Sequence, residues 1–258
     1  MKKTRIIAFS GFLGDPSDWD FWRAFLPDSY ELETYLAKPE ENESCDDWCA
    51  RFLLEDKNLQ PSILVGYSLG GRVASQLLIC NPRRFKGLIA ISTHPGLQNA
   101  KEREDRILSD RIWANRFAPQ SGEDWNRLLK DWDSQPVFQR GLGTGSAPFT
   151  RHESDELKIR SQRQLLQMGL GTQPDLRGPL IESKIPQIWA SGALDQKFSA
   201  LASQFSQLSD LQNHSPKTWV DWRSVSEVGH RFLWQLPPEQ SAKILNQWIG
   251  ELDEKASQ

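Results

Sequence analysis

Short apolar runs and amphipathic stretches follow one another along the chain. Apolar runs at 6–9, 63–65, 88–91 and 188–190 lie between polar or glycine-containing segments, which is typical of buried strands. Residues 30–36 alternate polar and apolar positions, as a half-buried strand does, and strand signals return at 219–222. The pattern also predicts helices over 44–57, from the glycine-rich turn at 66–71 to about Cys80, and from Pro237-Pro238 to about Trp248.

This alternation of strands and helices predicts an α/β fold with a mostly parallel central sheet and helices on both faces. Residues 95–183 break the alternation, because they are polar and helix-like and include a run from Gly141 to Ser146 that we expect to be flexible. We expect this stretch to be an inserted helical cap over the carboxyl edge of the sheet. Residues 1–94 and 184–258 then form the core.

Composition narrows the function classes. The chain has 258 residues, enough for one large domain, and its 31 Lys+Arg against 34 Asp+Glu give a net charge of −3. Because nucleic-acid binders normally have a basic excess, this balance argues against a nucleic-acid partner. No apolar run approaches the roughly 18 to 20 residues of a membrane span, and no signal peptide precedes the first strand. The chain is therefore expected to be cytoplasmic.

Three cysteines, Cys45, Cys49 and Cys80, make an odd number and cannot all pair within the chain. Cys45 and Cys49 are spaced to share one helical face, but no His or further Cys lies close in sequence to complete a zinc site. We expect reduced thiols, as in a reducing compartment, and no metal site.

The clearest chemical motif is Gly66-Tyr67-Ser68-Leu69-Gly70, a G-x-S-x-G pattern between an apolar strand and a helix. In that context it predicts the nucleophile elbow of an α/β-hydrolase, where the serine occupies a strained turn and larger residues at the glycine positions would collide with backbone. The Leu69 N–H opens the helix and is a candidate oxyanion donor. Phe12, in the turn after the first strand, is placed to supply the second amide, although a simple glycine-rich turn remains the alternative.

The other members of a triad should follow Ser68 in the order acid, then histidine. His230 lies shortly before the final helix, where a triad histidine belongs, and Asp195 follows the strand at 188–190. Of the remaining histidines, His94 follows a strand end and is more typical of a structural residue, while His152 and His214 lie in the insertion and in a polar stretch. Ser68, Asp195 and His230 are therefore the candidate catalytic residues.

Arg72 is less expected in a simple ester hydrolase. It lies one helical turn after Ser68, which places it on the same helix face at the mouth of the site. A guanidinium there suits a substrate carboxylate, because its fork of donors matches carboxylate geometry. Pairing with an acidic residue of the cap is the alternative. Arg103 and Arg106 share a helical face nearby, where an ordinary salt-bridged surface explains them equally well.

Several segments together resemble one family, the 2-succinyl-6-hydroxy-2,4-cyclohexadiene-1-carboxylate synthases (MenH) of menaquinone or phylloquinone biosynthesis. The resemblance extends over about residues 6–250, and the cap segments are more specific than the elbow. The matching segments are 66–74, 94–100, 109–113, 131–132, 135–138, 173–177, 195–202 and 229–230.

The resemblance implies a carbon–oxygen lyase without cofactor or metal. Family members remove a ring proton from 2-succinyl-5-enolpyruvyl-6-hydroxy-3-cyclohexene-1-carboxylate and expel pyruvate. Carried over, Ser68, made basic by His230 and Asp195, abstracts the proton, and the Phe12 and Leu69 amides stabilise negative oxygen charge. Matching substrate-binding positions are Arg72, Arg106, Tyr67, Trp132 and Lys197.

Two departures from the family concern the wall of the pocket. Ser10 stands where many relatives have histidine, and residues 35–40 replace the usual glycine–histidine–glycine turn after the second strand. Two other functions remain open at this point. A serine carboxylesterase or thioesterase would use the same three residues for acyl transfer, and a non-catalytic binding protein would retain the fold alone.

Overall fold

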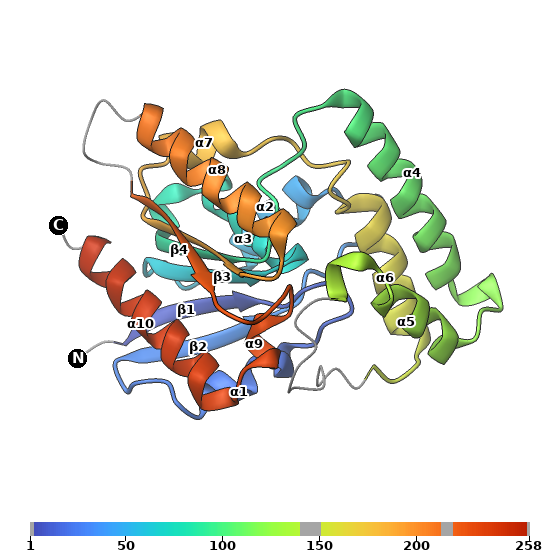
Figure 1. The fold of residues 1–258 in the computed structure, drawn as a ribbon, viewed down its shortest axis with the longest axis horizontal. Helices are drawn as coiled ribbons and strands as arrows, with labels where there is room; N and C mark the ends of the chain where they lie inside the picture. The colour runs from blue at the N-terminus through green and yellow to red at the C-terminus, as the bar shows by residue number, and fades with distance from the viewer. Residues whose placement is uncertain (1–2, 140–150, 213–218, 257–258) are drawn as a thin grey trace.

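A computed structural model describes residues 3–139, 151–212 and 219–256. Its centre is a six-stranded sheet, and every pair of neighbouring strands is parallel (Figure 1). The strand order is β2-β1-β3-β4-β5-β6, so the chain starts near one edge and finishes at the other. The strands are β1 (Thr4–Phe9), β2 (Tyr30–Tyr35), β3 (Ser62–Tyr67), β4 (Phe85–Ile91), β5 (Gln187–Gly192) and β6 (Val220–Val225).

Helices connect the strands and cover both faces of the sheet. The described α-helices are α1 (Asp20–Arg23), α2 (Cys45–Glu55), α3 (Leu69–Cys80), α4 (Ala100–Phe117), α5 (Trp125–Asp133), α6 (Asp155–Gln167), α7 (Arg177–Glu182), α8 (Gln196–Gln212), α9 (Phe232–Gln235) and α10 (Pro238–Ala256). Short 3-10 turns lie at Pro16–Trp19, Pro82–Arg84, Pro119–Ser121 and Pro136–Phe138.

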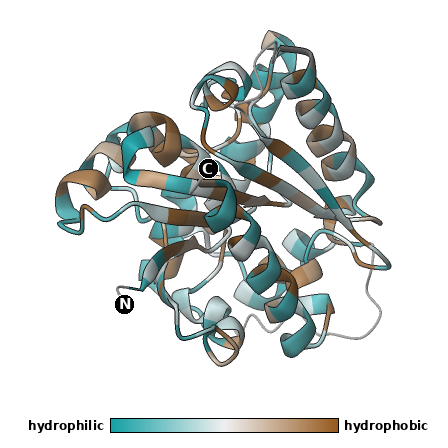
Figure 2. Cartoon of the chain, turned by 90° about the vertical axis from the view of Figure 1, so that its left-hand side faces the viewer, coloured by the Kyte–Doolittle hydropathy of each residue, from teal (hydrophilic) through white to brown (hydrophobic). Residues whose placement is uncertain are grey.

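Because successive strand residues point to opposite faces, each face of the sheet has its own apolar core. On β3, Leu64 packs with α2, α3 and α8, whereas Ile63 and Val65 pack with α9 and α10. The same division holds along β1 and β4. In Figure 2 hydrophilic and hydrophobic residues alternate around single helices, as expected where one side of each helix packs on the sheet. The predicted α/β-hydrolase architecture, with its parallel sheet and helices on both faces, is thus observed.

Helices α4 to α7 lie between β4 and β5, in the stretch expected to form a cap. Figure 1 shows α4, α5 and α6 together beside one end of the sheet. An aromatic cluster fills the space among them, with the rings of Trp132 and Phe117 centred 5.8 Å apart. Phe12, from the loop after β1, packs against Trp132 at 4.5 Å between ring centroids. This contact joins the inserted helices to the loop after β1.

Some boundaries differ from those expected. The final helix continues past Trp248 to Ala256, because Ile249 and Leu252 prolong the apolar stripe that packs on the sheet. The helix expected at 44–57 ends at Glu55, and α8 was not expected. The run Gly141–Ser146 and His214 lie outside the described residues.

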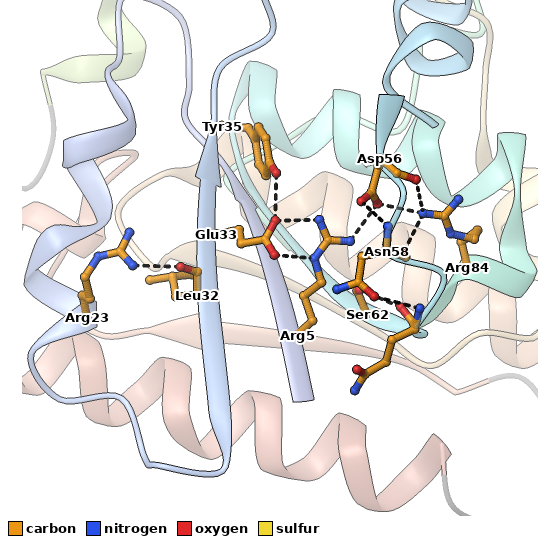
Figure 3. Close-up of polar contacts among 10 residues, drawn as sticks. Arg5, Arg23, Leu32, Glu33, Tyr35, Asp56, Asn58, Ser62 and Arg84 are labelled. Atoms are coloured by element: carbon orange, nitrogen blue, oxygen red, sulfur yellow. Dashed lines mark hydrogen bonds and ion pairs between the residues drawn. The ribbon is translucent and has the colours of Figure 1, made fainter. Parts of the chain in front are cut away.

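A network of charged side chains links β1 and β2 to the end of α2 (Figure 3). Arg5, only 3% exposed, donates two hydrogen bonds to Glu33 on β2, at 2.7 and 2.6 Å, and one to Asp56 at 2.7 Å. Asp56 also accepts from Arg84, and Tyr35 donates to Glu33. Because each buried charge has an opposite partner, the network holds the end of α2 against β1 and β2.

Within the described residues, none of the helices has both the length and the apolar character needed to span a membrane.

Candidate active site

Ser68 occupies a strained turn between β3 and α3. Its backbone has φ 52° and ψ −112°, a positive φ that costs free energy for a residue with a side chain. Two hydrogen bonds hold the turn: Ser68 N–H donates to the Ile91 carbonyl at 2.9 Å, and the Thr93 hydroxyl donates to the Ser68 carbonyl at 2.7 Å. The neighbouring strand β4 therefore supports the strained conformation.

The glycines of the motif are required by close backbone contact. A Cβ on Gly66 would lie 2.3 Å from the Gly70 carbonyl oxygen, and a Cβ on Gly70 would lie 2.2 Å from the Phe9 carbonyl oxygen. The Gly70 carbonyl belongs to α3 and the Phe9 carbonyl to β1, so neither atom can move without displacing one of these elements. A side chain at either glycine of the elbow would therefore collide with backbone, as the G-x-S-x-G motif predicts.

The loop after β1 lies across the start of α3. Among the described residues, the backbone N–H groups of Phe12 and Leu69 donate no hydrogen bond to the protein, so both are available to a ligand. Ser10, 3% exposed, donates its hydroxyl to the Asp15 carbonyl at 2.8 Å and so closes the same loop internally. Ser10, which stands where many relatives have histidine, thus stabilises the backbone of the loop after β1.

His230 and Asp195 form a buried pair. His230 Nδ1 and Asp195 Oδ2 are 2.6 Å apart, and each side chain is 3% exposed. Such a contact fixes the ring orientation and leaves Nε2 as the proton acceptor. The preceding Gly229 N–H donates to Gln235 Oε1 at 2.6 Å, which anchors the histidine loop. In the part of the chain that the structure describes, no hydrogen bond joins Ser68 to His230, and such bonds are often long before substrate binds.

A small cavity of about 40 Å³ lies beside Ser68. Four residues expected at the site, Phe12, Tyr67, Ser68 and Trp132, line it. The Tyr67 ring also lies 5.6 Å from the His230 ring, between centroids, so the cavity and the histidine share a wall. The other lining residues are Gly11, Gly14, Asp18, Phe138, Arg151 and Arg231.

Two guanidinium groups in this wall share one carboxylate. Arg231 Nη2 donates to Asp133 Oδ1 at 2.6 Å, and both Nη atoms of Arg151 donate to the same oxygen at 3.2 Å. Burial lowers the pKa of Arg151, which still leaves an arginine cationic at neutral pH. Asp18 also lines this cavity, and burial raises its pKa to about 7. The wall is therefore positively charged when Asp18 is protonated.

Arg72 follows Ser68 on α3 but has neutral partners. Its Nη1 donates to the Met168 carbonyl at 2.7 Å and to Gln173 Oε1 at 2.8 Å. Burial, with a smaller contribution from the charge of Arg106, lowers the Arg72 pKa to about 10, so it remains cationic at neutral pH. An acidic cap partner, the alternative for this residue, forms no hydrogen bond to it among the described residues; Asp110 acts on it only through its nearby charge.

Arg106 and Lys197 belong to a second group of cations, centred on His94. Arg106 Nε donates to both oxygens of the buried Asp110, one turn further along α4, at 2.8 and 2.9 Å. The charges of Arg106, Lys197 and Arg72 all act on His94. None of these three cations lines the small cavity beside Ser68.

Sequence reasoning missed three ionisable residues of the cavity wall. Arg231 directly follows His230, and that adjacency was the available signal. Asp18 lies in the 3-10 turn that follows β1, and its carboxylate accepts a hydrogen bond from Asp15 N–H at 2.9 Å. Its sequence position is therefore typical of a capping residue. Arg151 carries no local signal, because only the fold of the insertion brings it to Ser68. No group of three metal-ligating side chains occurs in the described ranges.

Comparisons with known proteins agree with this geometry. A family model described as the alpha/beta hydrolase fold matches residues 37–235. The chain is 34% identical over 217 residues to 2-succinyl-6-hydroxy-2,4-cyclohexadiene-1-carboxylate synthase of Citrobacter koseri, covering 78% of this chain and 81% of that protein. The protein of the same name from Klebsiella pneumoniae is 32% identical, with 81% and 85% covered.

Among solved structures, MenH from S. aureus superposes with a TM-score of 0.80 over 99% of this chain and 95% of that one, at 23% identity. This likeness concerns the fold, whereas the sequence identities above establish the family. With its elbow serine, buried histidine–aspartate pair and six-stranded parallel sheet, the chain belongs to the 2-succinyl-6-hydroxy-2,4-cyclohexadiene-1-carboxylate synthase family of α/β-hydrolase-fold proteins.

Proposed function

We propose that the protein is a 2-succinyl-6-hydroxy-2,4-cyclohexadiene-1-carboxylate synthase, a lyase that eliminates pyruvate from 2-succinyl-5-enolpyruvyl-6-hydroxy-3-cyclohexene-1-carboxylate. The observation that carries the proposal is the cavity beside Ser68, whose wall includes the guanidinium groups of Arg151 and Arg231. The positive charge of such a wall favours a substrate carboxylate over a neutral ester group. The name shared by the relatives supports the same conclusion.

In the proposed mechanism, His230, oriented by Asp195, takes the proton of the Ser68 hydroxyl. The serine oxygen then removes a ring proton, the bond from the ring to the enolpyruvyl oxygen breaks, and the pyruvate unit leaves with that oxygen. No acyl-enzyme forms. The Phe12 and Leu69 amides stabilise the negative oxygen charge that develops, and they are suited to this because neither donates within the described protein.

Substrate binding is assigned to two groups of residues. Tyr67 and Trp132 line the wall beside Ser68, and Arg151 and Arg231 supply positive charge there. Arg72, Arg106 and Lys197 supply it from the region of His94, where their charges converge. Cations on two sides of Ser68 suit a substrate whose carboxylates stand on separate arms.

We assign residues 95–183 to a cap and residues 1–94 with 184–258 to the catalytic core. Supporting this division, Trp132 and Phe138 come from the inserted segment and line the same cavity as Ser68. The cap then excludes water from the reacting serine. We also place the protein in the cytoplasm, in keeping with three cysteines that are all free thiols.

The test is a pyruvate-release assay with the named substrate, using the purified full chain without added cofactor. We expect Ser68→Ala to abolish release, because the proposed base is lost. Arg72→Ala should lower kcat/KM at least about tenfold, since a hydrogen bond to a charged group contributes about 1.5–3 kcal/mol. Arg83→Ala is the matched control, because Arg83 is exposed in the 3-10 turn Pro82–Arg84 beyond the end of α3, and it should behave as wild type.

Full turnover by Ser68→Ala would contradict the proposed base. Rapid hydrolysis of neutral activated esters, with a covalent adduct on Ser68 and no response to Arg72→Ala, would instead identify a carboxylesterase or thioesterase.

A further inference from the structure

The three cysteines meet between α2 and α3, away from the cavity just described. Cys45 and Cys49 lie one turn apart on α2, and Cys80 is the last residue of α3. The Cys49 sulfur lies 3.9 Å from the Val73 carbonyl oxygen, so it packs on the face of α3 that carries Cys80 two turns later. The thiols of Cys45 and Cys80 both act on the Cys49 thiol, where they add to the effect of burial in raising its pKa.

The three thiols differ in exposure. Cys45 and Cys49 are buried in the apolar core, at 5% and 0% exposed, whereas Cys80 is exposed to solvent. A small oxidant in solution can therefore reach Cys80 first.

They also differ in acidity. Hydrogen bonds from the Cys49 thiol and from the Gln76 side chain lower the Cys80 pKa to about 7, which makes a large share of this thiol a thiolate at neutral pH. Burial raises the pKa of Cys49, so that thiol keeps its proton. The arrangement pairs an exposed nucleophilic sulfur at the end of α3 with a buried protonated thiol that packs on the same helix.

We propose that Cys80 and Cys49 form a peroxide-reactive thiol pair, in which exposed Cys80 is oxidised first and Cys49 then closes a disulfide between α2 and the end of α3. The oxidant is a hydroperoxide. The Cys80 thiolate attacks one peroxide oxygen, which gives a sulfenic acid and hydroxide or alkoxide. The Cys49 sulfur then attacks the Cys80 sulfur, a disulfide forms, and the sulfenic oxygen leaves as water with the Cys49 proton, so two electrons have passed to the peroxide.

Cys45 is the less suitable partner for Cys49. Both lie on the same helix, so a bond between their sulfurs would require α2 to distort. Cys49, and to a smaller extent the Gln173 side chain, lower the pKa of the Cys45 thiol. Gln173 in turn accepts a hydrogen bond from Arg72. Cys45 therefore packs near the Gln173 side chain that binds Arg72. Cys80, at the end of the adjacent helix α3, is the more suitable partner for Cys49.

The cross-link would enclose the elbow. Ser68 lies between Cys49 and Cys80 in sequence, so a bond between these cysteines closes a loop that contains β3 and the whole of α3. Such a loop restrains the unfolded chain, and the oxidised protein should therefore melt at a higher temperature.

The experiment treats the full-length protein with a small molar excess of hydrogen peroxide at pH 7 and maps cysteine linkages by peptide mass spectrometry under non-reducing conditions. We expect a Cys49–Cys80 disulfide, the loss of two titratable thiols, and a rise in Tm of several degrees that dithiothreitol reverses. Cys45→Ser, the matched control, should still form the disulfide. Cys80→Ser, a change at an exposed position, should form none, and alkylation of Cys80 in the wild type should block it equally.

A Cys45–Cys49 disulfide in the wild-type protein would overturn the proposal. So would oxidation of Cys80 to its sulfinic or sulfonic acid while Cys49 remains a thiol. Because linkage mapping and melting do not depend on turnover, they separate this proposal from the assignment of the lyase activity.

Discussion

At the scale of single residues, the elbow requires glycine, which has no Cβ, at two positions. The contacts around Gly66 and Gly70 leave no room for a methyl group, while the chain bends through a positive φ at Ser68. Ser68 can adopt that conformation because hydrogen bonds from β4 and its loop hold it on both sides. Catalytic geometry at this point is therefore a matter of backbone packing before it is a matter of side-chain chemistry.

We expect Gly70→Ala to destabilise the fold by about 1–3 kcal/mol, because the new Cβ would lie 2.2 Å from the Phe9 carbonyl oxygen and force the strand or helix to shift. Urea denaturation measures this. Gly250→Ala is the control, since nothing lies within 4 Å of a Cβ there, and it should stabilise α10 by roughly 0.5–1 kcal/mol. Equal stability of the two variants would show that the elbow tolerates a side chain.

At the scale of elements, the insertion depends on well-capped helices. Helix α4 is mostly polar and buries few side chains, among them Ala114 and Phe117. Its start is therefore held largely by Asn99, whose Oδ1 accepts hydrogen bonds from Lys101 N–H at 2.8 Å and Glu102 N–H at 3.2 Å. Arg106, on the second turn of α4, is placed by the same helix start.

Asn99→Ala should lower the free energy of unfolding by about 0.5–2 kcal/mol, as expected when an N-cap acceptor is lost. Asn99→Asp keeps an acceptor at that position and adds a favourable charge at the helix N-terminus, so it should be at least as stable as wild type. Chemical denaturation compares the three proteins. An alanine variant as stable as the aspartate variant would contradict the stabilising role of Asn99 as the N-cap of α4.

At the scale of the whole molecule, charges from distant segments converge on one histidine. His94 follows β4 and is 7% exposed, and its Nδ1 accepts a hydrogen bond from Gly96 N–H at 3.0 Å. Burial, followed by the charges of Arg177 and Lys197 and then of Arg72 and Arg106, lowers its pKa to about 3. These cations come from α7, α8, α3 and α4, so only the assembled fold produces the shift.

We therefore expect His94 to stay neutral down to about pH 3, whereas a histidine in the unfolded chain titrates near 6.5. Between these values the unfolded chain binds more protons than the folded one. The contribution of His94 to stability is thus complete above about pH 6.5 and is lost as the pH falls toward 3. Imidazole NMR shifts measure the titration directly, with His94→Gln to assign the signal. A His94 midpoint near 6.5 would contradict the convergence of charge.

The amino-acid sequence by itself predicted the six strands, the elbow, and His230 and Asp195 as candidate partners, whose buried contact the structure shows. Each of these has a local signature, such as an apolar run, a glycine spacing or a histidine placed just before the last helix. The far end of α10 was misjudged because its stripe continues on residues whose burial depends on the sheet.

Only the tertiary structure decided which charges surround Ser68 and His94. Arg151 and Arg231 are far apart in sequence and meet at Asp133 because the segment between β4 and β5 packs against the loop after β6. Arg72 has neutral partners for the same reason, since Met168 and Gln173 follow α6. Local patterns report which residues can form strands, helices and turns, whereas charge–charge distances between segments arise only when those elements pack.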